Sequence, residues 1–234
     1  MRAGVMSAEV LFARSTVREK VRSEEESVPE AGGWNPEDFA REQIRGLVRQ
    51  VFFSNVERPV RQVVFSAMDP ETDVKSICRQ VGEALALETT DSVALVGEHP
   101  QVLRDPDTCQ SKNPDGSASL REAATRLHGN LWLVPAWQQR GVRGTTLELH
   151  SHLGAVRREF EYSILEGRPA GESNEATSMA QFADGIILVL SASNTRRVVA
   201  RKIKAMLDAT QARVLGTVLT DRVFPIPEGI YRRL

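Results

Sequence analysis

The fold is decided by residues 61–78, which read Arg-Gln-Val-Val-Phe-Ser-Ala-Met-Asp-Pro-Glu-Thr-Asp-Val-Lys-Ser-Ile-Cys. The apolar run at 63–65 predicts a buried strand, and a loop that contains Pro70 follows it. Lys75 and Ser76 then open a helix over residues 74–88 with its apolar side chains on one face. A strand, a loop, Lys-Ser and a helix are the layout of a phosphate-binding loop, G-x-x-x-x-G-K-[ST].

The loop lacks the two glycines of that motif, because Asp69 and Val74 stand in their places. A phosphate cradle needs backbone conformations that glycine adopts easily and a β-branched residue such as Val74 does not. Asp69, Glu71 and Asp73 surround Lys75, so the loop carries a net charge of −2 where a triphosphate would sit. Unit charges about 4 Å apart interact by roughly 4 kcal/mol at a surface-like dielectric. We therefore expect this loop to bind ATP poorly.

Composition limits the class of protein. The 234 residues suffice for one sizeable α/β domain with appendages, and the net charge of −1 gives no global reason to expect nucleic acid or an anionic membrane as a partner. Cys78 and Cys109 are the two cysteines, which fits a reducing cytoplasm. No apolar run approaches 18 residues, and no signal-peptide pattern opens the chain, so we expect neither a membrane span nor secretion.

The chain divides into a charged arm, residues 1–36, and a domain over residues 37–234. We expect the arm to be flexible, with a short helix within residues 6–16. The domain opens with a helix from about residue 36 to 51, on which Glu42, Arg45 and Arg49 share a stripe. Intrahelical ion pairing explains that stripe, and so does a contact with another subunit.

Further apolar runs predict strands at 92–97, 130–135, 160–165, 184–190 and 214–219, and helices at 119–127, 145–159, 174–182 and 194–209. For the last helix we expect Asn194 or Thr195 as the cap. Its buried side chains should be Val198, Val199, Ile203 and Leu207, opposite a solvated basic face from Arg196 to Lys204. That face contains no interleaved aromatic residue, which disfavours nucleic acid. Strands alternating with helices predict an α/β fold with a doubly wound, mostly parallel sheet.

Three segments resemble the bacterial tyrosine kinases of exopolysaccharide and capsule synthesis. Residues 160–169, Phe-Glu-Tyr-Ser-Ile-Leu-Glu-Gly-Arg-Pro, are similar to their Walker B segment. Residues 183–189 and 214–220 are similar to two later strands, and residues 224–234 to the tail of one branch of these proteins. The resemblance extends over residues 37–234 and implies a P-loop NTPase-like domain.

The departures from the family pattern fall on positions that carry its chemistry. Gly97 stands where an aspartate serves Mg²⁺, with Glu98 beside it, and Glu166 replaces the Walker B aspartate. Thr220 stands where an asparagine reads adenine, and only two tyrosines exist, Tyr162 and Tyr231. The resemblance thus implies a vestigial nucleotide site made of Asp69, Pro70, Val74, Lys75, Ser76 and Thr220, with Gly97, Glu98 and Glu166 at the two Walker carboxylate positions. We assign no catalytic residue.

Metal sites have weaker support. The Asp69-x-Glu71-x-Asp73 spacing begins like a calcium loop, but Val74 replaces the turn glycine and Gln80 the terminal glutamate. Two nearby histidines, at 150 and 152, have no further convergent ligands. We expect no metal and no cofactor.

The leading hypothesis is a catalytically degenerate relative of these kinases, a pseudoenzyme that regulates or scaffolds polysaccharide synthesis or export. The alternatives are an active protein-tyrosine kinase with ATP and Mg²⁺ as cofactors, and a nucleotide-binding switch of the partition type. We expect a cytoplasmic protein without a membrane span, held near the inner membrane by an anchored partner. Family members associate through a Glu-x-x-Arg-x-x-Arg helix, which Glu42, Arg45 and Arg49 resemble with one residue added. We therefore expect a partner that is a membrane-anchored protein, or a second copy, bound through this helix.

Overall fold

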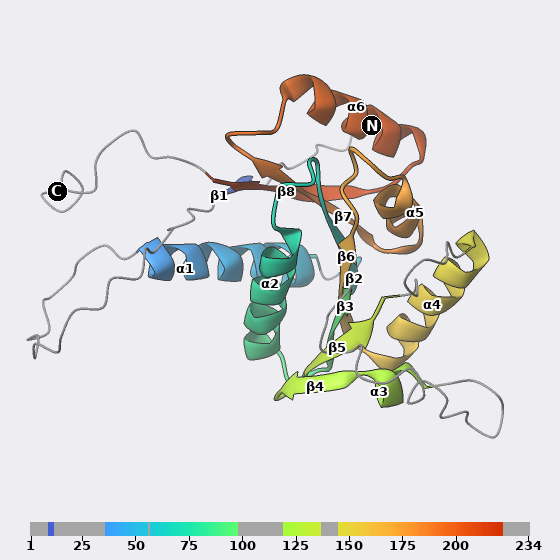
Figure 1. The fold of residues 1–234 in the computed structure, drawn as a ribbon. Helices are drawn as coiled ribbons and strands as arrows, with labels where there is room; N and C mark the ends of the chain where they lie inside the picture. Colours follow the sequence, from blue (N-terminus) through green and yellow to red (C-terminus); the bar gives the residue numbers. More distant parts are fainter. Residues whose placement is uncertain (1–8, 12–35, 56, 98–118, 137–144, 222–234) are drawn as a thin grey trace, which may run out of the picture.

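A single sheet of eight strands organises the part of the chain that the structure, a computed structural model, describes: residues 9–11, 36–55, 57–97, 119–136 and 145–221 (Figure 1). The strands are β1 (Glu9–Leu11), β2 (Gln62–Ala67), β3 (Val93–Gly97), β4 (Thr125–His128), β5 (Leu131–Pro135), β6 (Tyr162–Gly167), β7 (Gly185–Ser191) and β8 (Val214–Thr220). Their order is β1-β8-β7-β2-β6-β3-β5-β4, and every neighbouring pair is parallel except β4 with β5. The predicted α/β fold with a mostly parallel sheet is confirmed.

Strand β2 lies near the middle of the sheet, between β7 and β6, with Phe65 paired to Glu166 on one side and to Ile187 on the other. All six residues of β2 are buried, as the apolar run at 63–65 predicts. The chain leaves β2 toward β3, returns to β6 and then crosses to β7 on the far side of β2. Such a reversal of direction makes the carboxyl ends of these strands the place where a doubly wound sheet binds ligands.

Helices cover both faces of the sheet (Figure 1). Helix α1 (Pro36–Val48) and helix α2 (Val74–Glu88) pack on one face. Helices α4 (Thr146–Glu159), α5 (Glu175–Phe182) and α6 (Arg197–Ala209) pack on the other. A further short helix, α3 (Leu120–Ala123), precedes β4. Each face therefore has its own hydrophobic layer, as a doubly wound sheet requires.

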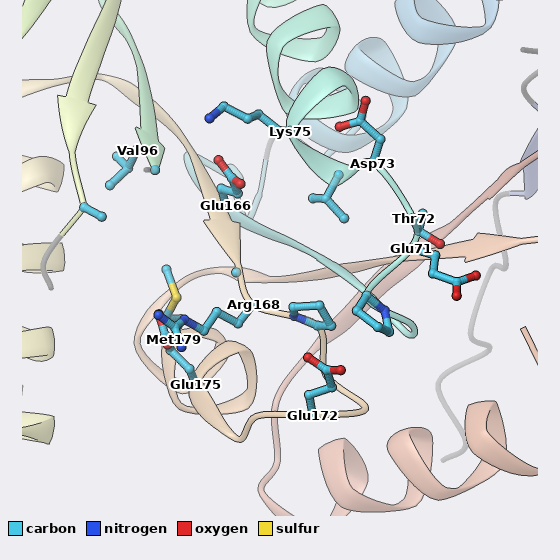
Figure 2. A pocket seen from close by; sticks show the side chains of 16 residues that line it. Glu71, Thr72, Asp73, Lys75, Val96, Glu166, Arg168, Glu172, Glu175 and Met179 are labelled. Atoms are coloured by element: carbon cyan, nitrogen blue, oxygen red, sulfur yellow. Dashed lines mark ion pairs between the residues drawn. The ribbon is translucent and has the colours of Figure 1, made fainter. Parts of the chain in front are cut away.

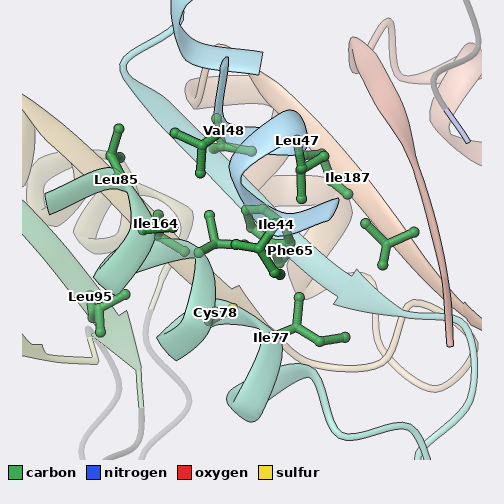
Figure 3. Packing of buried hydrophobic residues seen from close by; sticks show 14 of the residues in the cluster. Ile44, Leu47, Val48, Phe65, Ile77, Cys78, Leu85, Leu95, Ile164 and Ile187 are labelled. Carbon is green, nitrogen blue, oxygen red and sulfur yellow. The ribbon is translucent and has the colours of Figure 1, made fainter. Parts of the chain in front are cut away.

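The layer beneath α1 and α2 is closely packed (Figure 3). Ile44 and Val48 of α1 belong to the same cluster as Ile77 and Leu85 of α2 and Phe65 of β2. Leu85 and Phe65 are completely buried. Burying a side chain of this size contributes about 1.5–3 kcal/mol relative to leaving it exposed.

Helix α1 does not stop at Val48 but continues as a π-helical turn, Arg49–Phe53. Such a turn is one residue wider than an α-helical turn. It buries Phe52, whose ring makes an edge contact with Tyr162 at a centroid distance of 5.8 Å. The exposed Phe53 makes a similar contact at 5.9 Å. These aromatic contacts attach the end of the first helix to the start of β6.

Several predicted elements are wrong in detail. The helix expected at 119–127 ends at Ala123, and Thr125–His128 instead form β4, which turns back into β5 through Gly129 at a φ of +53°. The helix expected within 6–16 is contradicted at residues 9–11, which pair as β1 with β8; the remainder of that segment lies outside the described residues. The loop at 99–117 and the tail at 224–234 also lie outside them.

Helix α6 also differs from its prediction. Its N-cap is Arg196, not Asn194 or Thr195, and no side chain caps it. Val198 is 78% exposed and Val199 is half-buried, whereas Ile203 and Leu207 are buried as predicted. The helix begins later than expected because Thr195 is used elsewhere: its hydroxyl bonds to the β2–α2 loop.

Candidate functional site

A cavity of about 630 Å³ opens at the carboxyl ends of β2, β3 and β6 (Figure 2). Its walls come from the loop between β2 and α2, from the end of β3, from the segment that follows β6, and from the start of α5. Sixteen residues line it: Pro70, Glu71, Thr72, Asp73, Val74, Lys75, Val96, Gly97, Ala136, Glu166, Gly167, Arg168, Pro169, Glu172, Glu175 and Met179. The cavity lies where a nucleotide site is expected in this topology.

The first turn of α2 is capped by a carboxylate of the protein itself. Asp73 is the N-cap, and its Oδ1 accepts a hydrogen bond from the backbone N–H of Ser76 at 3.0 Å. The backbone N–H of Val74 donates to the carbonyl of Thr72 at 2.9 Å. No residue from Met68 to Val74 has a positive φ. The amide groups at this helix end, which would face a phosphate in a glycine-rich loop, are thus directed in part to groups of the protein itself.

The same loop is tied to the segment between β7 and α6. The hydroxyl of Thr195 donates to Asp69 Oδ2 at 2.5 Å, and it accepts the backbone N–H of Ser191 at 2.9 Å. Asn194 donates to the Glu71 carboxylate at 3.0 Å. Two of the three acidic side chains that the sequence places around Lys75 are therefore held by the loop that leads into α6.

The side chain of Glu166 lies against the backbone of Gly97. A Cβ placed on Gly97 would clash with Oε2 of Glu166, and would lie 3.0 Å from its Cβ. Glu166 Oε2 is shielded from solvent. The carboxylate of Glu166 therefore fills the space that a side chain at position 97 would need. The two departures from the family pattern, a missing aspartate on β3 and a longer acid on β6, are sterically matched.

Acidic residues outnumber basic ones around the cavity. Five carboxylates line it, those of Glu71, Asp73, Glu166, Glu172 and Glu175, against the two cations Lys75 and Arg168. Arg168 forms an ion pair with Glu175 at 3.4 Å, and Figure 2 shows Lys75 near Glu166. The lining has a net charge of −3. Within the described ranges, no three acidic, His or Cys side chains are grouped to hold a metal ion.

The structure brings together most of the residues predicted for the nucleotide site. Pro70, Val74, Lys75, Gly97 and Glu166 all line the cavity. The other three described members of the predicted set do not line it: Asp69 is bonded to Thr195, Ser76 accepts a hydrogen bond from Gln80 at 3.1 Å, and Thr220 bonds to the carbonyl of Leu190 at 3.2 Å. Glu98 lies outside the described residues.

Sequence reasoning missed the contribution of the segment that follows β6. Glu172 and Glu175 line the cavity opposite the β2–α2 loop, and Arg168 does so with them. The available signal was the position of this segment: it follows a buried parallel strand, so it must lie at the same edge of the sheet as the loop after β2.

The predicted interaction stripe lies on α1 (Glu42 and Arg45) and on the first residue of the π-helical turn that continues it (Arg49); we call it the α1 stripe, and ion pairs within the chain use all three side chains. Arg45 lies 3.8 Å from Glu42 on the same helix. Arg49 bonds to both carboxylate oxygens of Glu88, at 2.9 and 3.4 Å, and this partner raises the pKa of Arg49. Glu88 is the last residue of α2, so the pair joins the π-helical turn after α1 to the end of α2 that lies away from the cavity.

Fold and cavity together define a P-loop NTPase-like α/β domain. No family model matches the sequence, and no curated protein matches it. Solved structures do match the fold. The kinase domain of the Escherichia coli tyrosine kinase ETK is 14% identical, with a TM-score of 0.68, over 93% of this chain and 92% of that one. The chimerical protein CapA2B2 is 16% identical, with a TM-score of 0.62, over 79% and 86% of the two chains.

ATPases of another kind share the fold. A ParA family ATPase from Chlorobium tepidum is 13% identical, with a TM-score of 0.56, over 73% of this chain and 78% of that one. At these identities the matches establish the fold. The predicted resemblance to bacterial tyrosine kinases is confirmed at that level, and so is the P-loop-like fold class.

Proposed function

We propose that this chain is a catalytically degenerate relative of the exopolysaccharide tyrosine kinases, and that it regulates or scaffolds polysaccharide synthesis or export. The observation that carries the proposal is the Asp73 carboxylate at the first turn of α2, bonded to the N–H of Ser76. The positive end of a helix stabilises one anion close to its first turn, and here that anion is part of the protein. A phosphate at this point would meet a negative charge.

The surroundings of Asp73 support the same conclusion. The cavity lining has a net charge of −3, and a nucleoside triphosphate would add several negative charges to it. Gly97 offers no carboxylate for Mg²⁺, and the space for one is filled by Glu166. Phosphoryl transfer depends on placing phosphates, metal and acceptor together. The residues present therefore fit Mg-ATP poorly.

The assignment to polysaccharide synthesis rests on the resemblance of residues 160–169, 183–189 and 214–220 to that kinase family. A partner contact would use Glu42 and Arg45 of α1 and Arg49 of the π-helical turn that follows it. The partner would be a membrane-anchored protein or a second copy, and the site of action would be the cytoplasmic side of the inner membrane. None of the helices in the described ranges is long and apolar enough to span a bilayer.

Titration calorimetry with Mg-ATP tests the proposal directly. We expect no heat of binding at micromolar nucleotide for the wild-type chain, and the same result for Lys75→Ala. Arg79→Ala, an exposed change further along α2, is the matched control. Micromolar binding that is abolished by Lys75→Ala and kept by Arg79→Ala would overturn the proposal.

The second candidate is a working nucleotide-dependent protein. It is favoured by one observation: Lys75 and Glu166, the cation and the acid that such a site needs, line the same cavity. ATP and Mg²⁺ would then be its cofactors. If calorimetry detects binding, transfer of phosphate to a tyrosine-containing polypeptide separates an active tyrosine kinase from a partition-type switch, which binds nucleotide without that transfer.

A further inference from the structure

The outward side of α6 is strongly basic. From Arg196 to Ala209 the sequence has five basic residues and one acidic residue, a net charge of +4. All five basic residues are exposed, whereas Ile203 and Leu207 on the opposite side of the helix are buried. We call this surface the basic face of α6; it consists of Arg196, Arg197, Val198, Arg201, Lys202, Lys204 and Ala205. In Figure 1 the helix lies on the outside of the molecule, beyond β7 and β8.

Ion pairs within the protein account for little of this charge. Lys204 pairs with Asp208 one turn later, at 2.7 Å. No other basic residue of the face has an acidic partner in the part of the chain that the structure describes. On a neighbouring element, the Glu71 carboxylate accepts a hydrogen bond from Asn194, just before the helix, and not from a basic residue of the face. The basic face therefore keeps most of its positive potential.

Two basic residues of the face lie at the N-terminal end of α6, which is the positive end of the helix dipole. Arg196 is the N-cap and Arg197 the first helical residue, no acidic residue occupies the first turn, and no side chain caps the helix. Cations at the positive end of a helix are unfavourable for its stability, and an uncapped first turn is too. A sequence that breaks these local rules without a compensating contact is expected where a surface serves binding.

An apolar strip runs through the basic face. Val198 is 78% exposed, and Ala205, two turns further along the same stripe, is exposed as well. Helical spacing puts Arg197, Arg201 and Lys204 on one side of this strip and Lys202 on the other. Cations that flank exposed apolar residues are the pattern of helices that lie on a membrane surface.

The shape of the face favours a flat partner. It is the convex outer side of one helix, about 20 Å long, and none of the residues that line the cavity belongs to it. An acidic peptide is usually held in a groove, and stacked nucleic acid needs aromatic residues, which α6 does not contain.

We propose that the basic face of α6 binds the anionic lipid headgroups of a bilayer directly. The contact is peripheral, because the remaining apolar side of the helix is used by the protein core. This surface is separate from the α1 stripe and from the cavity, and the proposal stands whether or not nucleotide binds.

Sedimentation of the full chain with lipid vesicles tests it. We expect binding to phosphatidylcholine vesicles that contain about one-third phosphatidylglycerol, none to phosphatidylcholine alone, and release at high salt. Replacing two of the cations, Arg197→Gln with Lys202→Gln, should weaken the partition by about 25-fold, since each cation near an anionic surface contributes roughly fivefold. Val198→Ser should give a smaller loss without changing the charge.

The matched control is Arg41→Gln with Arg79→Gln, which removes two exposed cations from α1 and α2 on the opposite face of the sheet. It should bind as the wild type does. Equal binding to both kinds of vesicle, or an equal loss in the control, would overturn the proposal. Failure to bind any vesicle would overturn it too, and binding of polyglutamate by the same face would then assign the surface to an acidic protein partner.

Discussion

From Ile77 to Leu85, helix α2 packs as the helix after the phosphate-binding loop of a P-loop-like domain should, whereas its first turn, Asp73 to Ser76, is capped by a carboxylate where a phosphate would otherwise bind. The body of the helix is buried against β2 and α1. The first turn is capped by a carboxylate and faces an acidic cavity. The two regions are consecutive in sequence and less than one helix length apart.

The difference separates what maintains the fold from what would support nucleotide chemistry. Burial of apolar surface requires only side chains of the right size on the right face of α2. A phosphate site requires particular backbone angles and a particular sign of charge within one turn. A sequence can therefore lose the second while it keeps the first, which is why the fold matches kinase domains although the loop does not match their motif.

The largest expected effect on the free energy of unfolding comes from truncating a buried side chain in the body of α2. Leu85→Ala removes a completely buried side chain beneath α1 and should lower the free energy of unfolding by about 3 kcal/mol, measured by urea denaturation at neutral pH. Lys75→Ala, in the first turn, should lower it by less than about 1 kcal/mol.

Leu87→Ala is the control for that comparison, because it makes the same change on the same helix at a side chain that is 78% exposed. It should have an effect within about 0.5 kcal/mol of zero. If Lys75→Ala destabilised the protein as much as Leu85→Ala, the first turn would belong to the structural core, and the contrast drawn between the two regions would be wrong.

An effect of at most similar size tests whether the hydrophobic core tolerates a charged side chain. His152 of α4 is largely buried, its Nε2 has no hydrogen-bond partner within the described residues, and burial lowers its pKa to about 4. In the unfolded chain the pKa is near 6.5, so the unfolded state binds the proton first as the pH falls. Stability should be unaffected by this residue above pH 6.5, and should fall by up to about 3 kcal/mol between pH 6.5 and 4.

The measurement is the free energy of unfolding as a function of pH for the wild type, His152→Gln and His150→Gln. His150 is exposed on the same helix and serves as the control. The slope between pH 6.5 and 4 should flatten in His152→Gln and persist in His150→Gln. Equal slopes in all three proteins would show that His152 does not titrate as its burial implies.

The sequence predicts the elements that build this core because their patterns are local. A fully apolar run bounded by turn residues is enough to place β2, β3 or β7, and the 3.6-residue period places α2 and α4. The two missed strands lack that signal. Strand β4 is a short, mostly exposed edge strand whose pairing depends on the turn at Gly129, and β1 has three residues that form a strand only by pairing with β8.

Some residues of the cavity were predictable from the sequence, but its arrangement was not. Lys75 and Glu166 follow from their motif positions. The cap by Asp73 depends on a rotamer, and the filling of the Gly97 space by Glu166 depends on the register of two strands that are not consecutive. The late start of α6 depends on a hydrogen bond from Thr195 to Asp69, 126 residues away in sequence. Contacts of this kind leave no local pattern.

The smallest expected effect concerns the far end of α2, where Glu88 binds Arg49 of the α1 stripe. A subunit contact through this stripe would compete with that pair, so we predict only weak self-association, visible by analytical ultracentrifugation at high protein concentration. Arg45→Glu with Arg49→Glu should weaken it by roughly fivefold, because repulsion from Glu42 and Glu88 is added to the lost contacts.

Arg79→Glu with Arg126→Glu makes the same change in net charge at exposed positions of α2 and β4, outside the α1 stripe, and should leave the association unchanged. The same three proteins can be titrated with the cytoplasmic segment of a candidate membrane-anchored partner. If the wild type is strictly monomeric and both substitutions leave partner binding unchanged, the helix serves only to pack against the core. Ile44, Leu47 and Val48 already explain its presence by burial alone, so the charges on its other face must show an effect of their own.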